Sequence, residues 1–177
     1  MSEPADPRAD DPLLKLLFIC THNRCRSILC EALARHLSAG RIAAFSAGSQ
    51  PAGAVHPDTL FHLQKHGVDI SGLRSESWDA YANLSPDAVI TVCDSAAGEQ
   101  CPLWLGRAVK VHWGLPDPSR FDGADEERAA AFDSVMATIE RRLQRLLDRD
   151  LRTLKAGDAL RLALEQIAQE GNDHGTV

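Results

Sequence analysis

Eight consecutive residues near the start of the chain, Cys20 to Ser27, supply the groups that a reaction on a tetrahedral oxyanion needs. They read Cys-Thr-His-Asn-Arg-Cys-Arg-Ser. A cysteine thiolate is a strong nucleophile, and the planar guanidinium of Arg26 can hold two oxyanion oxygens at once. The hydroxyl of Ser27 can donate a hydrogen bond to the Cys20 sulfur. We therefore predict that Cys20 is a nucleophile, Arg26 an oxyanion clamp and Ser27 a group that stabilises the thiolate.

The residues on either side of this loop predict where it lies in the fold. Residues 13–19 form a short apolar run typical of a buried strand. The spacing of apolar residues from Ile28 to Leu37 indicates a helix that Gly40 ends. The loop amides and the N-terminus of that helix form a positive concavity that suits phosphate or a similar anion. The same field is expected to lower the pKa of Cys20 and to increase its thiolate fraction.

Strand-like and helix-like segments alternate along the rest of the chain. This alternation predicts one α/β domain, a three-layer sandwich around a four-stranded parallel sheet, with ligands bound beyond the carboxyl ends of the strands. The predicted boundaries are a disordered tail at 1–12, a catalytic domain at 13–150, and a C-terminal helical extension and tail at 151–177. The remaining predicted strands are 42–46, 87–93 and 108–112, and the remaining predicted helices are His56 to Gly67, Asp125 to Arg149 and Leu151 to Gln169.

Composition limits the classes of function. The chain of 177 residues, 44% of them hydrophobic, fits one globular domain. Its net charge of -6 argues against a general nucleic-acid binder, which needs a basic surface. Because no secretory signal or run of membrane-spanning length is found, we expect a cytoplasmic protein without a membrane partner. The five cysteines are then expected to be catalytic or redox thiols, and their spacing predicts no metal site.

Four features together carry a family resemblance. They are the Cys20-x5-Arg26-Ser27 loop, Asn23 within it, the Ser46-Ala-Gly48 strand end and Asp117-Pro118 late in the chain. On these motifs the chain resembles, from about residue 14 to 147, the low-molecular-weight protein tyrosine phosphatase superfamily, including its arsenate reductase branch. The resemblance implies that Asp117 is the general acid. The other loop residues are expected to contact the substrate, namely Thr21, His22, Asn23, Arg24 and Cys25.

Two further cysteines, Cys93 and Cys101, flank a polar segment directly after a predicted strand. In the thioredoxin-coupled arsenate reductases that this chain resembles, the loop cysteine forms a thiol-arsenate adduct. A second cysteine attacks the adduct to release arsenite, and a third takes over the disulfide. The resemblance implies that Cys20, Cys93 and Cys101 act in that order, with an external reductant and no bound cofactor. Because the segment is one residue longer than in the best-known members, the reductant stays open among thioredoxin, glutaredoxin and a low-molecular-weight thiol.

The loop alone does not separate a reductase from a phosphatase, because phosphate and arsenate are close in shape and charge. Ser119 and Arg120 stand where the tyrosine phosphatases place aromatic residues, so a phenyl ring would lack its stacking partners. Together with Cys93 and Cys101, this favours an arsenate reductase. The alternatives are a phosphatase that hydrolyses phosphomonoesters through a phosphocysteine on Cys20 and a non-enzymatic, thiol-based sensor of metalloids or redox state.

Several other side chains of suitable chemistry have structural explanations. Cys25 is expected either to form a protective disulfide with Cys20, as the resemblance permits, or to be a small loop residue. Cys30 is expected to pack as a hydrophobe, and Asn23 to fix the loop backbone through side-chain hydrogen bonds. 

Two charged features on helices are also expected to be structural. Glu31 is expected to be a solvated carboxylate rather than a ligand of a structural monovalent cation, which the resemblance also permits. The arginines from Arg141 to Arg152 are expected to form a solvated helix surface.

Overall fold

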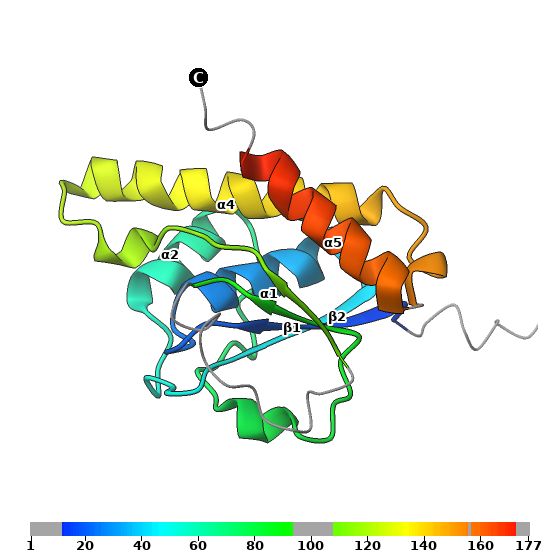
Figure 1. Ribbon diagram of the computed structural model, residues 1–177. Helices are drawn as coiled ribbons and strands as arrows, with labels where there is room; N and C mark the ends of the chain where they lie inside the picture. The colour runs from blue at the N-terminus through cyan, green and yellow to red at the C-terminus, as the bar shows by residue number, and fades with distance from the viewer. Residues whose placement is uncertain (1–11, 94–107, 156, 173–177) are drawn as a thin grey trace, which may run out of the picture.

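The computed structural model describes residues 12–93, 108–155 and 157–172, which form a parallel sheet with helices packed on it (Figure 1). The strand order is β2-β1-β3-β4, and each of the three neighbouring pairs is parallel. The predicted α/β fold with a four-stranded parallel sheet is therefore confirmed. The strands span Leu14–Ile19 (β1), Ile42–Ala47 (β2), Ala88–Thr91 (β3) and Val109–His112 (β4).

The register of the sheet brings the ends of three strands to one edge. β1 lies between β2 and β3, and its apolar residues are buried. Ile19, the last residue of β1, pairs with Ala47 on β2 and with Thr91 on β3. Because the strands are parallel, the segments that follow them leave the sheet side by side, and the segment that begins at Cys20 is the middle one.

Three helices cover one face of the sheet. Figure 1 shows α1, α4 and α5 on one side of the strands and the short 3-10 helix η1 (Trp78–Tyr81) on the other. α1 packs against β1, β2 and α4, while α5 packs against α4 and β4, so that one apolar core fills the space between them. None of the helices in the described ranges has the length and apolar character needed to cross a membrane. The helices span Arg26–Ser38 (α1), Pro57–Lys65 (α2), Asp125–Leu147 (α4) and Gly157–Asn172 (α5).

The helix ends follow from local chemistry. The side chain of His56 accepts a hydrogen bond from the amide of Asp58 at 3.0 Å, and Pro57 occupies the first turn of α2. α1 ends in a turn in which Gly40 takes a φ of 90°, a conformation that glycine adopts without strain. The predicted start of α2 and end of α1 are therefore confirmed.

The last helix begins later than the sequence predicts. The apolar periodicity predicts a helix from Leu151, but residues 150–155 form a turn and a short 3-10 helix, and α5 begins at Gly157. In the turn, the carbonyl of Asp150 accepts a hydrogen bond from the hydroxyl of Thr153 at 2.8 Å. Such side-chain to backbone bonds offer the chain an alternative to the helix, which apolar spacing does not reveal.

α4 and α5 together enclose the tryptophan that follows β4. The indole N–H of Trp113 donates to the carbonyl of Leu164 on α5 at 3.0 Å. The guanidinium of Arg142 on α4 lies 5.9 Å from the centre of the Trp113 ring and donates to the carbonyl of Gly114 at 3.4 Å. Arg142 is only 5% exposed, so the predicted solvated arginine surface is wrong at this position, because the Trp113 ring covers it.

The buried face of α5 gives a test of what this helix contributes to stability. Leu164 is completely buried, whereas Leu162 on the same helix is 66% exposed. We expect Leu164→Ala to lower the free energy of unfolding by about 2–5 kcal/mol, because it leaves a cavity in the core. Leu162→Ala should change it by less than about 0.5 kcal/mol. Urea unfolding measures both values, and equal effects of the two substitutions would contradict the packing of α5 on the core.

Candidate active site

The oxyanion loop (residues 20–27) leaves β1 with its carbonyl groups turned outward. The carbonyls of Thr21, His22 and Arg24 accept hydrogen bonds from three amides of the segment 50–56, at 2.9, 2.9 and 3.0 Å. The described peptide bonds are trans, and in a trans peptide the N–H points away from the C=O. The amides that follow these three carbonyls therefore point into the loop, where they can bind an anion.

Asn23 fixes the middle of the loop from inside. Its φ is 46°, in the left-handed region that Asn tolerates, and it is completely buried. Its side-chain amide donates to the hydroxyls of Ser27 at 2.8 Å and Ser46 at 3.0 Å. Its side-chain oxygen accepts from the amide of Glu76 at 2.8 Å. The prediction that Asn23 fixes the loop backbone is confirmed.

Arg26, the first residue of α1, connects the loop to the chain that follows β4. Nη1 donates to the carbonyl of Leu115 at 3.1 Å, and Nη2 lies 3.6 Å from Oδ2 of Asp117. Within the described residues, no acceptor lies in hydrogen-bonding range of the buried Nε. The guanidinium is thus anchored through its terminal nitrogens, and Nε is a donor available to an oxyanion.

Asp117 is surrounded by hydrogen-bond donors and positive charge. It caps the short 3-10 helix η3 (Pro118–Arg120), where its Oδ1 accepts from the amide of Ser119 at 3.0 Å and from the Ser119 hydroxyl at 2.6 Å. Its Oδ2 lies 3.6 Å from both Arg26 and Arg120. Asp117 therefore lies beside Arg26, the predicted oxyanion clamp. A carboxyl group in this position is close to the oxygens of a bound oxyanion and could give a proton to a leaving oxygen.

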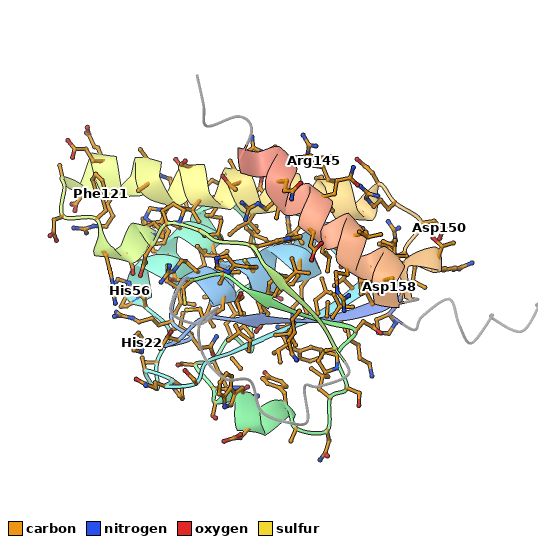
Figure 2. The ribbon with its side chains drawn as sticks, viewed as in Figure 1. His22, His56, Phe121, Arg145, Asp150 and Asp158 are labelled. Carbon is orange, nitrogen blue, oxygen red and sulfur yellow. The ribbon has the colours of Figure 1, made fainter. Side chains whose placement is uncertain are left out.

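The rim around the loop is mostly polar in the part of the chain that the structure describes. His22 and Arg24 are exposed, as is Arg120. Phe121, which follows η3, is 44% exposed and lies at the same end of the molecule as His22 (Figure 2). Ser119 and Arg120 both contact Asp117, and neither offers an aromatic ring that could stack on a phenyl group.

The end of β3 brings a second thiol to the predicted nucleophile. Cys93 is 3% exposed, its sulfur accepts from the amide of Thr21 at 3.4 Å, and a hydrogen bond links it to Cys20. That bond and burial raise the pKa of Cys20, whereas the backbone amide of Asn23 and the charge of Arg26 lower it. The expected lowering of the Cys20 pKa is therefore wrong for this arrangement, because two buried thiols in contact do not both ionise readily.

Two of the other cysteines lie in the core of the protein. Cys25 and Cys30 are buried free thiols, and burial raises the pKa of each to about 12. Cys30 is completely buried within α1, which confirms the prediction that it packs as a hydrophobe. Cys20 is a free thiol as well, so of the two expectations for Cys25 the structure shows the small loop residue and not the disulfide with Cys20. Cys101 lies outside the described residues, so its role as the resolving thiol stays a prediction.

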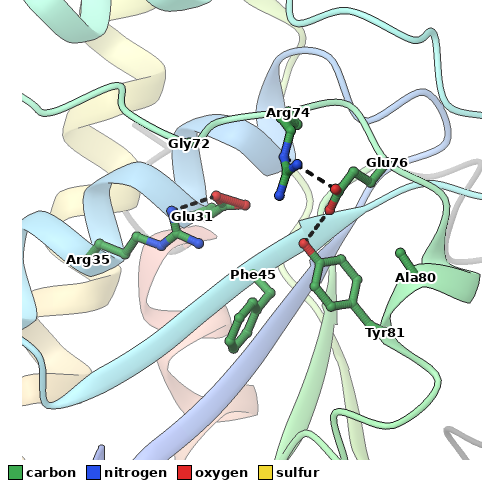
Figure 3. Close-up of a pocket in the computed structure, with 8 residues that line it drawn as sticks. All are labelled: Glu31, Arg35, Phe45, Gly72, Arg74, Glu76, Ala80 and Tyr81. Carbon is green, nitrogen blue, oxygen red and sulfur yellow. Dashed lines mark hydrogen bonds and ion pairs between the residues drawn. The ribbon is translucent and has the colours of Figure 1, made fainter.

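Glu31 is not the solvated carboxylate that its place on a helix predicts. It is 3% exposed, because it lies on the face of α1 that packs against β2. One carboxylate oxygen accepts from the hydroxyl of Ser46 at 2.7 Å, and the other lies 3.1 Å from Arg35. The Arg35 guanidinium therefore balances this charge within the protein (Figure 3). In the described residues, no cluster of three or more His, Cys, Asp or Glu side chains is suited to a metal ion.

Two backbone groups of the site have no signal in the sequence. The carbonyl of Leu115 accepts from Arg26, and the amide of Glu76 donates to Asn23. A backbone group reveals nothing of its role through residue type, and both segments are distant from the loop along the chain. The sequence offered one indirect signal, the Ser46-Ala-Gly48 motif at the end of β2. Gly48 lies against the back of the loop, and its amide donates a hydrogen bond to the carbonyl of Glu76.

The fold and the loop together define a class of protein. A cysteine at the carboxyl end of a central parallel strand, inward-pointing amides and an arginine are the parts of a site where a tetrahedral oxyanion meets a nucleophile. The family described as low molecular weight phosphotyrosine protein phosphatase matches residues 15–158. The chain belongs to this family.

Similar curated proteins carry the name arsenate reductase. An "Arsenate reductase" from Bacillus subtilis is 33% identical over 129 residues, which cover 73% of this chain and 91% of the relative. A "Glutaredoxin arsenate reductase" from Synechocystis sp. is 30% identical over 133 residues, which cover 75% of this chain and 95% of the relative. The similarity therefore spans nearly the whole of these relatives.

Similar solved structures also carry the name arsenate reductase. "An arsenate reductase in the phosphate binding state" is 31% identical with a TM-score of 0.62, over 76% of this chain and 97% of that chain. A thioredoxin-dependent arsenate reductase from Corynebacterium glutamicum is 28% identical with a TM-score of 0.56, over 78% of this chain and 64% of that chain. These likenesses agree with the parallel α/β fold described above.

Gly48 allows a test of how closely the loop is supported from behind. A Cβ atom at this position would lie 2.5 Å from the carbonyl oxygen of Thr21 and 2.8 Å from that of Cys20. Gly48→Ala must therefore displace the loop, and we expect phosphate to bind at least about tenfold more weakly. Gly157→Ala is the control, since a Cβ there meets nothing within 4 Å. Titration calorimetry with phosphate measures both, and unchanged affinity in Gly48→Ala would contradict this account.

The contact between the two thiols predicts a change in reactivity. Because Cys93 raises the pKa of Cys20, Cys93→Ala should lower that pKa and move the pH profile of Cys20 alkylation to lower pH. The rate of reaction with iodoacetamide, read by mass spectrometry across pH, measures the midpoint. Cys30→Ala removes a buried thiol from the core of α1 and is the matched control. A midpoint that rises in Cys93→Ala would show that the second thiol instead stabilises the Cys20 thiolate.

Proposed function

We propose that the chain is an arsenate reductase that converts arsenate to arsenite with Cys20 as its nucleophile. The observation that carries this proposal is the contact of the Cys93 thiol with Cys20 and with the loop amide of Thr21. A second thiol at this place serves a redox reaction, whereas hydrolysis through a phosphocysteine has no use for it. The names of the relatives and of the similar structures support the same activity.

In the proposed first step, the sulfur of Cys20 attacks the arsenic atom of arsenate. A sulfur–arsenic bond forms, and one arsenate hydroxyl leaves as water with the proton that the thiol gives up. Asp117 is proposed to deliver the proton to the leaving oxygen, and Ser27 to donate to the sulfur. The inward amides and Arg26 balance the charge of the remaining oxygens. Arsenic stays in its +5 state in this step.

In the proposed second step, the thiolate of Cys93 attacks the sulfur of Cys20. A disulfide bond forms while the sulfur–arsenic bond breaks, and its electron pair goes to arsenic, which leaves as arsenite in the +3 state. Cys101 then attacks Cys93, which frees Cys20 and leaves a disulfide between Cys93 and Cys101 for reduction from outside. The two electrons therefore come from two thiols of the chain.

The proposed reaction needs an external thiol reductant. Relatives named for thioredoxin and for glutaredoxin support a reductant of this kind. A low-molecular-weight thiol is the third candidate. We also propose a cytoplasmic location, since the thiols must be kept reduced there. In this proposal residues 13–150 are the catalytic unit, and 151–177 are the C-terminal extension.

A phosphatase acting on phosphomonoesters is the second candidate function. The family that the chain matches and the position of Asp117 next to Arg26 favour it. This reaction would pass through a phosphocysteine on Cys20, with Asp117 as the acid. It would need neither Cys93 nor Cys101, which separates the two candidates experimentally.

The test follows NADPH consumption during arsenate reduction, with thioredoxin, glutaredoxin and a low-molecular-weight thiol supplied in separate reactions. We expect multiple turnovers with one of them, and a loss of at least about 100-fold in Cys93→Ala and Cys101→Ala, because each removes an attacking sulfur. Both variants should still bind phosphate. Hydrolysis of p-nitrophenyl phosphate, measured in parallel, should be retained in Cys93→Ala and Cys101→Ala and lost in Cys20→Ala and Arg26→Ala.

Three results would contradict the proposal. Full multiple-turnover reduction in Cys93→Ala would show that the relay through Cys93 is wrong. Phosphomonoester hydrolysis without any arsenate reduction would support the phosphatase instead of the reductase. Arsenite binding without turnover, despite all three reductants, would favour the non-enzymatic sensor.

A further inference from the structure

Residues 113–115, which follow β4, continue the pairing with the neighbouring strand. The amide of Trp113 donates to the carbonyl of Thr91, the last residue of β3, at 2.7 Å. The amide of Leu115 donates to the carbonyl of Val92 at 3.0 Å. These two bonds hold one side of the segment, and further partners come from the helices α4 and α5.

The two C-terminal helices hold the same segment through side chains. The indole N–H of Trp113, whose ring is buried, donates to the carbonyl of Leu164 on α5 at 3.0 Å. Arg142 on α4 donates to the carbonyl of Gly114 at 3.4 Å, and its guanidinium lies 5.9 Å from the centre of the Trp113 ring. Figure 1 shows α5 beside α4, and the two helices pack on each other. α5 thus fixes the tryptophan whose ring Arg142 contacts.

The peptide between Gly114 and Leu115 is bonded at both of its polar groups. Its carbonyl accepts from Arg142, and its N–H donates to the carbonyl of Val92. Because the described peptide bonds are trans, these two groups point in opposite directions, and the two partners fix the peptide plane. Pro116 follows, and a proline restricts the backbone of the residue before it. The direction of the Leu115 carbonyl is therefore set by the fixed peptide on one side and by the proline on the other.

The Leu115 carbonyl is the group that anchors Arg26. It accepts from Nη1 of Arg26 at 3.1 Å, and the same segment carries Asp117, whose Oδ2 lies 3.6 Å from Nη2. A guanidinium is a rigid plane, so the positions of its terminal nitrogens decide where Nε points. A shift of the Leu115 carbonyl would therefore turn Nε, the donor available to an oxyanion, away from the loop.

The burial of Arg142 is costly for a residue that only packs. It is 5% exposed, and its Nε has no acceptor within the described residues. Burial lowers the pKa of its guanidinium, and the ionisable groups that act on it are Cys30 and Arg141 rather than a carboxylate. A buried cation without an anionic partner costs free energy, which an apolar side chain of similar length would avoid. The guanidinium is thus retained here at a cost, with the Gly114 carbonyl as its hydrogen-bond acceptor.

We propose that Arg142 and Trp113 are positioning residues for Arg26, and that α5 is the element that holds Trp113 in place. Arg142 fixes the peptide before Leu115, and the Leu115 carbonyl then holds the guanidinium of Arg26 with Nε toward the loop. α5 begins at Gly157, so a helix beyond the family match at residues 15–158 takes part in building the oxyanion site. The inference rests on the proposed function only in taking Arg26 as the oxyanion clamp, and it applies to phosphate as well as to arsenate.

The test compares Arg142→Met with Arg145→Met, which lies on the next turn of α4. Arg145 pairs with Glu170 on α5 (Figure 2), so its substitution disturbs the same pair of helices without removing a contact to residues 113–115. Phosphate that fills the loop should protect Cys20 from iodoacetamide. The phosphate concentration that gives half protection, read by mass spectrometry, measures the affinity even where binding is weak.

We expect phosphate to bind at least about fivefold more weakly in Arg142→Met, because the Leu115 carbonyl no longer directs Arg26. Arg145→Met should stay within about twofold of the parent. Trp113→Phe keeps an aromatic ring but loses the bond to α5, and it should weaken binding in the same direction. Arg142→Lys keeps a charged donor and should lose less affinity than Arg142→Met.

A double-substitution cycle shows whether the effect passes through Arg26. In an Arg26→Ala background, Arg142→Met should weaken phosphate binding by less than about twofold further. A loss of similar size in that background, equal losses in Arg142→Met and Arg145→Met, or no loss in Arg142→Met would overturn the proposal. A purely structural Arg142 would change the free energy of unfolding in urea and leave the phosphate affinity of the folded protein unchanged. If Arg142→Met does not fold, Trp113→Phe takes its place in both comparisons.

The two proposals fail in different ways. Absence of arsenate reduction together with the expected losses of phosphate affinity would overturn only the proposed function. Arsenate reduction by the parent together with a phosphate affinity that does not depend on Arg142 would overturn only the positioning role.

Discussion

The oxyanion loop depends on holding several peptide N–H groups toward one point although their dipoles repel one another. A chain can do this only if the carbonyls of the same peptides find partners elsewhere. Here the segment 50–56 supplies those partners from one side. Asn23 holds the loop from within, because its left-handed backbone turns the loop and its buried side chain bonds the hydroxyls of Ser27 and Ser46 and the amide of Glu76. The anion site is therefore built as much by the surrounding chain as by the loop.

The parallel sheet decides which groups meet at this loop. Because β3 ends beside β1, Cys93 reaches the loop and takes a hydrogen bond from the amide of Thr21. The hydrogen bond between Cys93 and Cys20 raises the pKa of Cys20, whereas the positive charge of Arg26 lowers it. 

The chain that follows β4 links the loop to the two C-terminal helices. The carbonyls of Leu115 and Gly114 accept hydrogen bonds from Arg26 and Arg142, respectively. The indole N–H of Trp113 donates a hydrogen bond to the carbonyl of Leu164 on α5. α5 lies almost wholly beyond residue 158, where the family match ends. In this chain a helix outside the shared region thus contacts the segment that carries Asp117 and anchors Arg26.

The sequence by itself determined the strands, most helix boundaries and the loop from Cys20 to Ser27, because apolar periodicity, caps and motif spacing are local. The place of Cys93 after a predicted strand singled out that thiol, and the family resemblance singled out Asp117. Only the tertiary structure decided that Glu31 and Arg142 are buried, that Leu115 anchors Arg26, and that Cys93 opposes ionisation of Cys20. The physical reason is that burial, backbone partners and electrostatic coupling depend on distances between segments that are far apart in the chain, which residue type and spacing do not encode.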